Sequence, residues 1–174
     1  ELDGIYTLKV AEVENLFLVE ELLNVVNTIM GFTDTLNVSK IKKYIIEKRF
    51  QPQINHQICD AVISEIKYQL STANITGKKD DEVKQSLEAT YSSIVFEDVK
   101  AAKESLFDEA LHANDYAQVL KIFNYKTMSK SVGHFFGLKD EEYHDFIIRQ
   151  LNSTRADEIK TAIIGYLPIE ISEE

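Results

Sequence analysis

The feature that most constrains the fold is a change in the period of the apolar residues near residue 18. Tyr6, Leu8 and Val10 alternate with the residues between them, which is the period-two pattern of a strand with one buried face. From residue 20 onward apolar residues recur every three or four positions, which is typical of helices. The sequence therefore predicts a mainly α, helical bundle-like domain that follows one N-terminal β-strand, at 6–11.

Two glutamates follow the predicted strand directly. If the extended backbone persists, Glu12 and Glu14 leave it on the same side, so a strand end could present two oxygen ligands to one hard cation. Open α/β sheets hold their sites at the carboxyl ends of strands. In the alternative interpretation, both glutamates only charge the first turn of a following helix. Asn15 is interpreted either as a cap or turn residue or as a functional amide.

The helical part of the chain is divided by turn signals into several segments. Leu22, Leu23 and Val26 mark the first helix, and Pro52 interrupts the second. The polar stretch 71–81 predicts a loop. Two apolar stripes are expected in the core, and they comprise Ile54, Ile58, Val62 and Ile66, and Leu106 and Ala110. Further helices are expected at 81–92, 97–111, 116–123, 128–136, 140–151 and 156–167.

Composition limits the classes of protein to which the chain can belong. Its 174 residues with 44% hydrophobic content suffice for one substantial core. The net charge of -10 argues against sequence-independent binding of nucleic-acid phosphates over a broad surface of the chain. Cys59 is the single cysteine, which excludes an intrachain disulfide and a cysteine-rich zinc site and suits the cytoplasm. No apolar run approaches the roughly 18 residues of a membrane span. The start at Glu1, without Met, suggests a piece of a longer protein.

A second candidate site lies in 124–130. Lys126 follows two aromatic residues, Phe123 and Tyr125, and is expected to open a helix whose free amides could hold a phosphate together with its cation. The alternative is an ordinary solvated lysine. The four histidines are scattered without the H-E-x-x-H spacing of a helical metal site. No G-x-S-x-G motif is present to anchor a Ser/His/Asp triad.

The run Leu8 to Leu18, in which Glu12-Val13-Glu14-Asn15-Leu16 is the core motif, resembles a Toprim-like bacterial family of unknown function. That family is related to the overcoming-lysogenization-defect nucleases and to the nuclease subunit of the PARIS anti-phage system. Asn124-Tyr125-Lys126 is similar to the family's later lysine-bearing segment, and the closing helix that ends at Leu167-Pro168 is similar to its C-terminal helix. The early Glu and the D-x-D pair of the family have no counterpart here.

The resemblance implies a division into 1–18, the strand and junction at the end of an upstream α/β Toprim-like core, 19–168, a helical C-terminal domain, and 169–174, a frayed acidic tail. It implies a metal-dependent nuclease, a phage-defence effector partnered by an ABC-type ATPase. Glu14 and Lys126 would be catalytic, and Glu12 and Glu14 would bind Mg²⁺ in the full-length parent. The chain alone is expected to bind no metal and to be inactive. Nucleic acid would be bound only through the parent, a homo-oligomer is possible, and no membrane is involved. The alternative function is a non-catalytic helical module for protein interaction or dimerisation.

Overall fold

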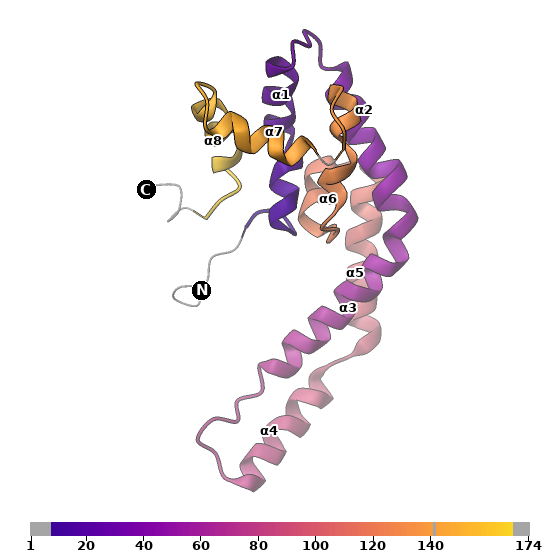
Figure 1. Ribbon diagram of the computed structural model, residues 1–174. Helices are drawn as coiled ribbons and strands as arrows, with labels where there is room; N and C mark the ends of the chain where they lie inside the picture. Colours follow the sequence, from indigo (N-terminus) through magenta and orange to yellow (C-terminus); the bar gives the residue numbers. More distant parts are fainter. Residues whose placement is uncertain (1–7, 141, 169–174) are drawn as a thin grey trace. The chain divides into compact units, whose positions relative to one another are not determined.

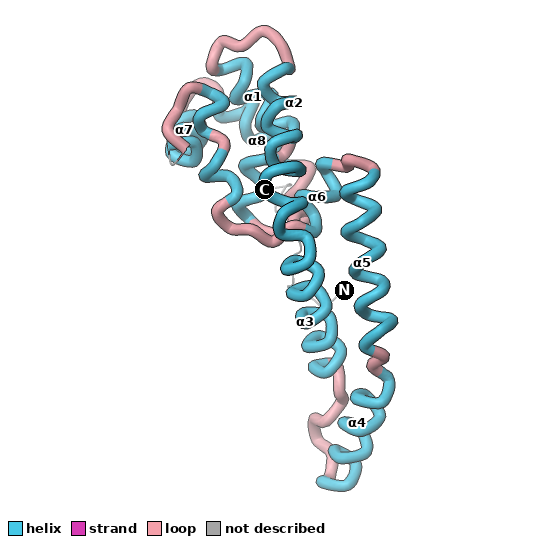
Figure 2. Tube along the Cα trace, turned by 90° about the vertical axis from the view of Figure 1, so that its right-hand side faces the viewer, coloured by secondary structure: helices cyan, strands magenta, loops and turns pink. Residues whose placement is uncertain are grey.

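The computed structural model describes residues 8–140 and 142–168 of the chain. All regular structure in these two ranges is helical, which confirms the predicted mainly α class, and Figures 1 and 2 show no strand among the described residues. Contacts divide the chain into two compact units, Glu1–Pro52 with Asn114–Glu174 (unit 1) and Gln53–Ala113 (unit 2). Unit 2 is therefore an insertion between two parts of unit 1. No described helix is long and apolar enough to cross a bilayer.

Unit 1 is an assembly of short helices. Its α-helices are α1 (Glu20–Ile29), α2 (Leu36–Tyr44), α6 (Tyr116–Ile122), α7 (Glu142–Leu151) and α8 (Ala156–Ile164). Three short 3₁₀ helices also belong to unit 1, and these are η1 (Val13–Leu18), η4 (Met128–Ser131) and η5 (Gly133–Phe136). A π-helix, η2 (Ile45–Phe50), continues α2. A short 3₁₀ turn, η3 (Gln51–Gln53), follows at Pro52, which lacks a backbone donor, and the next α-helix begins directly after it at Ile54. Pro52 thus interrupts the α-helical pattern, as predicted, but the chain remains helical through it.

The predicted strand at 6–11 begins outside the described residues. Residues 8–11 lie within them, and there the chain bends instead of pairing with another strand. The N–H of Lys9 donates to the carbonyl of Tyr166 at 3.1 Å, and the N–H of Ala11 donates to that of Leu120 at 2.9 Å. Each donor thus has a partner in a different segment of unit 1. A strand that pairs with an upstream sheet stays a prediction.

The core of unit 1 is built from the apolar faces of α1 and α2 and from aromatic residues of the C-terminal half. Leu22, Leu23 and Val26 of α1 are at most 1% exposed, as their helical spacing predicts. Burial of each such side chain contributes about 1.5–3 kcal/mol. Phe50 and Phe123 meet edge to face at 5.3 Å, a favourable geometry for two rings. The main core therefore joins segments that lie far apart in the sequence.

The helix predicted over 128–136 is wrong in type. This stretch forms two four-residue 3₁₀ turns, η4 and η5, which are separated at Val132. A Cβ atom on Gly133 would lie 2.8 Å from the Cα of Asp140, so the backbone of the following loop approaches Gly133 too closely for a longer helix with a side chain there. Gly137 then ends η5 with φ of 73°.

Unit 2 consists of α3 (Ile54–Ser71), α4 (Asp80–Ser93) and α5 (Phe96–His112), and α3 packs along α5. The loop predicted before α4 and the interruption before α5 are both observed. The predicted core stripes are only partly buried. Val62 and Ala110 are buried, whereas Ile54, Ile58, Ile66 and Leu106 are half-buried. Two packed helices cover one side of each stripe, and α4 contributes no buried residue.

Candidate functional site

Glu12 and Glu14 do not continue one extended face, contrary to the prediction. Glu12 is extended, with φ of −138° and ψ of 151°, but Glu14 already lies in the first turn of η1. The N–H of Asn15 donates to the carbonyl of Glu12 at 2.9 Å and closes this turn. The side-by-side arrangement of two strand residues is therefore lost. Both glutamates are half-buried, and neither carboxylate forms an ion pair with a described residue.

Asn15 ties η1 to the C-terminal half of unit 1. It is fully buried, and its side-chain amide donates to the carbonyls of Leu120 at 2.9 Å and Phe123 at 3.0 Å. This long-range role was not among those predicted for Asn15. The sequence carried one signal for it, an asparagine followed directly by the apolar residues Leu16 and Phe17, which is a pattern that also fits a cap or a turn.

The two segments singled out in the sequence lie together in the structure. η1 packs against η4, and Lys126 lies in the turn that leads into η4. Lys126 and Lys130 are exposed, and neither forms an ion pair with a described residue. The helix that Lys126 was expected to open is only the four-residue η4, which is too short to provide the predicted phosphate site at a helix N-terminus. The packing of η4 on η1 therefore brings positive charge toward η1, from Lys130 in η4 and from Lys126 in the turn before it.

His144 on α7 lies where η1 and η4 meet. Its Nε2 is 2.5 Å from the Oγ of Ser129, and its ring stacks on Phe17 with 4.1 Å between centroids. Burial, followed by the positive charge of Lys130, lowers the pKa of His144, while the carboxylates of Glu14 and Asp145 act in the opposite direction. The imidazole is therefore neutral near pH 7 and lies within electrostatic range of both Glu14 and Lys130.

The Ser129–His144 pair orients the imidazole and does not form a nucleophilic dyad. Ser129 is fully buried, so its hydroxyl cannot meet a substrate without rearrangement of η4. No sequence pattern predicts this pair, because the two residues share no motif spacing. We call the place where His144 lies within electrostatic range of Glu14 and Lys130 the η1–η4 corner.

No group of three or more His, Cys, Asp or Glu side chains that could hold a metal occurs among the described residues. Glu12 and Glu14 could therefore supply at most part of a metal site. Mg²⁺ is usually held through one or two carboxylates, with waters or substrate phosphates completing the octahedron, so a minority contribution by these residues fits its coordination chemistry.

No protein-family model matches the chain, and no curated protein or solved structure matches it.

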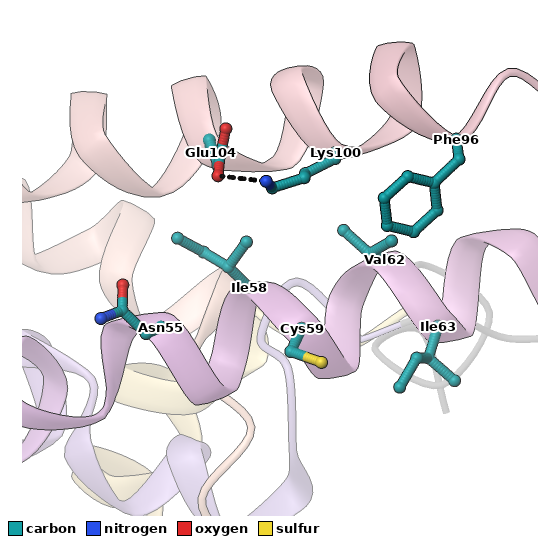
Figure 3. Close-up of a pocket in the computed structure, with 8 residues that line it drawn as sticks. All are labelled: Asn55, Ile58, Cys59, Val62, Ile63, Phe96, Lys100 and Glu104. Carbon is teal, nitrogen blue, oxygen red and sulfur yellow. Dashed lines mark ion pairs between the residues drawn. The ribbon is translucent and has the colours of Figure 1, made fainter.

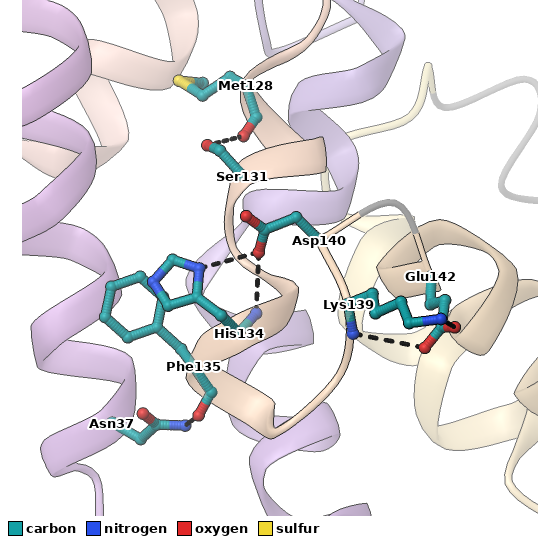
Figure 4. Close-up of polar contacts among 8 residues, drawn as sticks. All are labelled: Asn37, Met128, Ser131, His134, Phe135, Lys139, Asp140 and Glu142. Atoms are coloured by element: carbon teal, nitrogen blue, oxygen red, sulfur yellow. Dashed lines mark hydrogen bonds and ion pairs between the residues drawn. The ribbon is translucent and has the colours of Figure 1, made fainter.

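A second polar cluster of unit 1, around His134, is structural (Figure 4). The carboxylate of Asp140 accepts hydrogen bonds from the backbone N–H of His134 at 2.9 Å and from its ring Nδ1 at 2.8 Å. Burial alone would raise the pKa of Asp140, but the two hydrogen bonds from His134 and the ring's charge outweigh it, and the pKa lies below its usual range. The ring of His134 packs on Phe135 and Tyr44, with centroids 4.2 and 5.9 Å away. This cluster holds the loop after η5 in place.

Proposed function

We propose that the chain is the C-terminal helical part of a Toprim-like, metal-dependent nuclease, and that the η1–η4 corner borders its active site. One observation carries the proposal. The two segments that resemble the family, around Glu14 and around Lys126, are more than 100 residues apart in the sequence, yet η1 and η4 pack against each other.

The chemistry of the corner supports the same proposal. Metal-dependent hydrolysis of a phosphodiester uses carboxylates that hold the metal and cations that balance the charge of the phosphate. Glu14, with Glu12 as a further candidate, would hold Mg²⁺ together with carboxylates from another part of the protein. When bound, Mg²⁺ would polarise the phosphodiester and stabilise the departing oxygen. Lys126 would bind the phosphate as a point charge, and its exposure leaves it free to do so.

The parent protein would act on nucleic acid, and an ABC-type ATPase would be its partner in phage defence. The acidity of this chain, with a net charge of -10, means that the chain itself would contribute little to general retention of nucleic acid. We therefore expect the isolated chain to be inactive and the full protein to carry the metal-dependent activity.

The test is Mg²⁺- or Mn²⁺-dependent cleavage of DNA and RNA by the full protein that carries this chain. Glu14→Gln and Lys126→Met should each lower the cleavage rate by at least about 100-fold and leave the unfolding midpoint within error. Glu88→Gln on the exposed face of α4 is the matched control and should retain the rate. Glu20 and Glu21 are unsuitable controls, because Glu20 pairs with Lys42 at 2.6 Å and Glu21 accepts from Tyr166 at 2.8 Å. Retained activity in Glu14→Gln would show that the corner is not catalytic.

A further inference from the structure

Few side chains of unit 2 are buried. In Gln53–Ala113, which the structure describes throughout, only Gln57, Val62, Phe107 and Ala110 are buried. Large apolar side chains are exposed on all three helices and on the loops between them, and these are Ile63, Tyr68, Leu70, Ile75, Leu87, Tyr91, Val95 and Phe96. Where such side chains form a contiguous patch, they mark an interaction site.

Four of these exposed residues, Ile63, Leu70, Tyr91 and Phe96, line two adjoining hollows along α3, which we call the groove. Its first part, of about 300 Å³, is lined by Ile58, Val62 and Ile63 of α3 and by Phe96 of α5. Figure 3 shows Ile58 and Val62 pointing from α3 toward α5, and Phe96 pointing back toward α3. The second part, of about 420 Å³, shares Phe96 and continues past Leu70 and Tyr91. Phe96 therefore joins both parts.

The rim of the groove carries both signs of charge. Lys100 and Glu104 of α5 line it as a loose i,i+4 pair, with 3.7 Å between Nζ and Oε1 and nearly half of each side chain exposed. A partner of one strong charge would meet repulsion at one of the two residues. A second copy placed by a two-fold axis carries the same rim in the reverse sense, so Lys100 of one copy can lie opposite Glu104 of the other.

The size of the face also suits a second copy. A helix of the length of α3 is about 27 Å long, and two packed helices are roughly 20 Å wide. Their shared face thus covers roughly 500 Å² in projection, which is of the order that each partner contributes to a standard interface, about 800 Å² of accessible surface. The apolar middle with a polar rim is the usual composition of such an interface.

We infer that the α3–α5 groove of unit 2 is a self-association surface, and that two copies of this chain pack their grooves together. The inference does not depend on a nuclease function, because it uses no residue of the η1–η4 corner.

The first test measures the dissociation constant of the dimer by sedimentation equilibrium of the 174-residue chain over a concentration series. Ile63→Asn should raise that constant at least about tenfold. Leu87→Asn is the matched control, since Ile63 and Leu87 are 44% and 46% exposed but Leu87 on α4 does not line the groove. Circular dichroism of both variants checks that the helices remain. A wild-type chain that stays monomeric at high micromolar concentration overturns the inference, as does equal weakening by both variants.

The second test uses charge and does not disturb the apolar surface. Lys100→Glu gives a rim with two acids and Glu104→Lys gives a rim with two bases, so each variant should self-associate several-fold more weakly at low salt. An equimolar mixture of the two should associate at least as tightly as the wild type, because the rims are then opposite. The matched controls Lys84→Glu and Glu88→Lys change a similar i,i+4 pair on α4, 3.9 Å apart, and should have no such effect. A mixture no tighter than its components excludes groove-to-groove packing.

Discussion

The side-chain amide of Asn15 donates a hydrogen bond of 2.9 Å to the carbonyl oxygen of Leu120, although 105 residues separate the two. The same carbonyl also accepts a hydrogen bond from the N–H of Ala11. The side-chain amide of Asn15 donates a second hydrogen bond to the carbonyl of Phe123. The start of the described chain is thereby fixed to the C-terminal end of α6. Because η1 is fixed here, Glu14 is held at a defined place relative to η4.

Two substitutions of Asn15 should lower the free energy of unfolding of unit 1 by different amounts. Asn15→Asp places a carboxylate against two carbonyl oxygens in a buried site and should lower the free energy of unfolding by about 3–5 kcal/mol. Asn15→Ala should cost less, about 1–3 kcal/mol, because the carbonyl of Leu120 keeps the N–H of Ala11 as a partner. Urea denaturation measures both. Asn74→Asp, in the exposed loop before α4, should change the midpoint little. If Asn15→Asp is as stable as Asn15→Ala, the amide does not donate as described.

Gly133 should not tolerate even a methyl group. Its added Cβ would collide with the backbone of Lys139 and Asp140, so the loop held by His134 and Asp140 would have to shift. Gly133→Ala is expected to lower the free energy of unfolding by about 1–3 kcal/mol, as overpacking against backbone does. Gly165→Ala is the control. No heavy atom lies within 4 Å of its added Cβ and its φ is −64°, so it should be neutral or slightly stabilising. Thermal unfolding of the two variants decides between these outcomes.

Sequence periodicity was sufficient for the class of fold and for most helices, because local spacing determines which face of a helix is apolar. α1 begins at the predicted Glu20, and α3 follows Pro52 as expected. The core was harder to predict. The regular stripe of α3 was expected to be buried, but Ile58 and Ile66 are only half-buried, since burial depends on how many layers cover a helix and not on the stripe itself. The division into two units likewise depends on contacts between distant segments.

The candidate site shows the same limit. Glu14 and Lys126 could be singled out from local patterns, and the structure packs their segments together. His144 and Ser129 could not, because no spacing rule connects residues that meet only when α7 packs on η4. The 3₁₀ turn of η1 was also missed. The pattern up to Glu14 fits a strand, and the turn at Glu12 is stabilised by contacts of Asn15 that only the folded chain makes.

Asp140 should make unit 1 less stable in acid. Its pKa in the folded state lies below that of an unfolded aspartate, about 3.9, because His134 donates two hydrogen bonds to the carboxylate. The unfolded state therefore takes up the proton first as the pH falls, and the stabilisation is present above about pH 3.9 and is lost through the lower folded value. Since 38% of the side chain is exposed, solvent screening limits the effect to less than about 1 kcal/mol. Urea midpoints from about pH 5 to about pH 2 should fall less steeply in Asp140→Asn than in the wild type, and Glu88→Gln should follow the wild type.

The pKa of His144 reports directly on the η1–η4 corner. In the folded state it should lie below about 6.5, the value for an unfolded histidine. Between the folded and the unfolded pKa only the unfolded state binds a proton. The contribution of His144 to stability therefore falls as the pH decreases through this range. An NMR titration of the imidazole, without added metal, should show opposite shifts in two variants. Lys130→Met removes a repulsive charge and raises the pKa, whereas Glu14→Gln removes an attractive one and lowers it further. Lys84→Met on α4 is the control and should leave the pKa unchanged. If neither Lys130→Met nor Glu14→Gln moves the titration, the carboxylate and the ammonium do not share one corner with His144, and the electrostatic support for the proposed active site is lost.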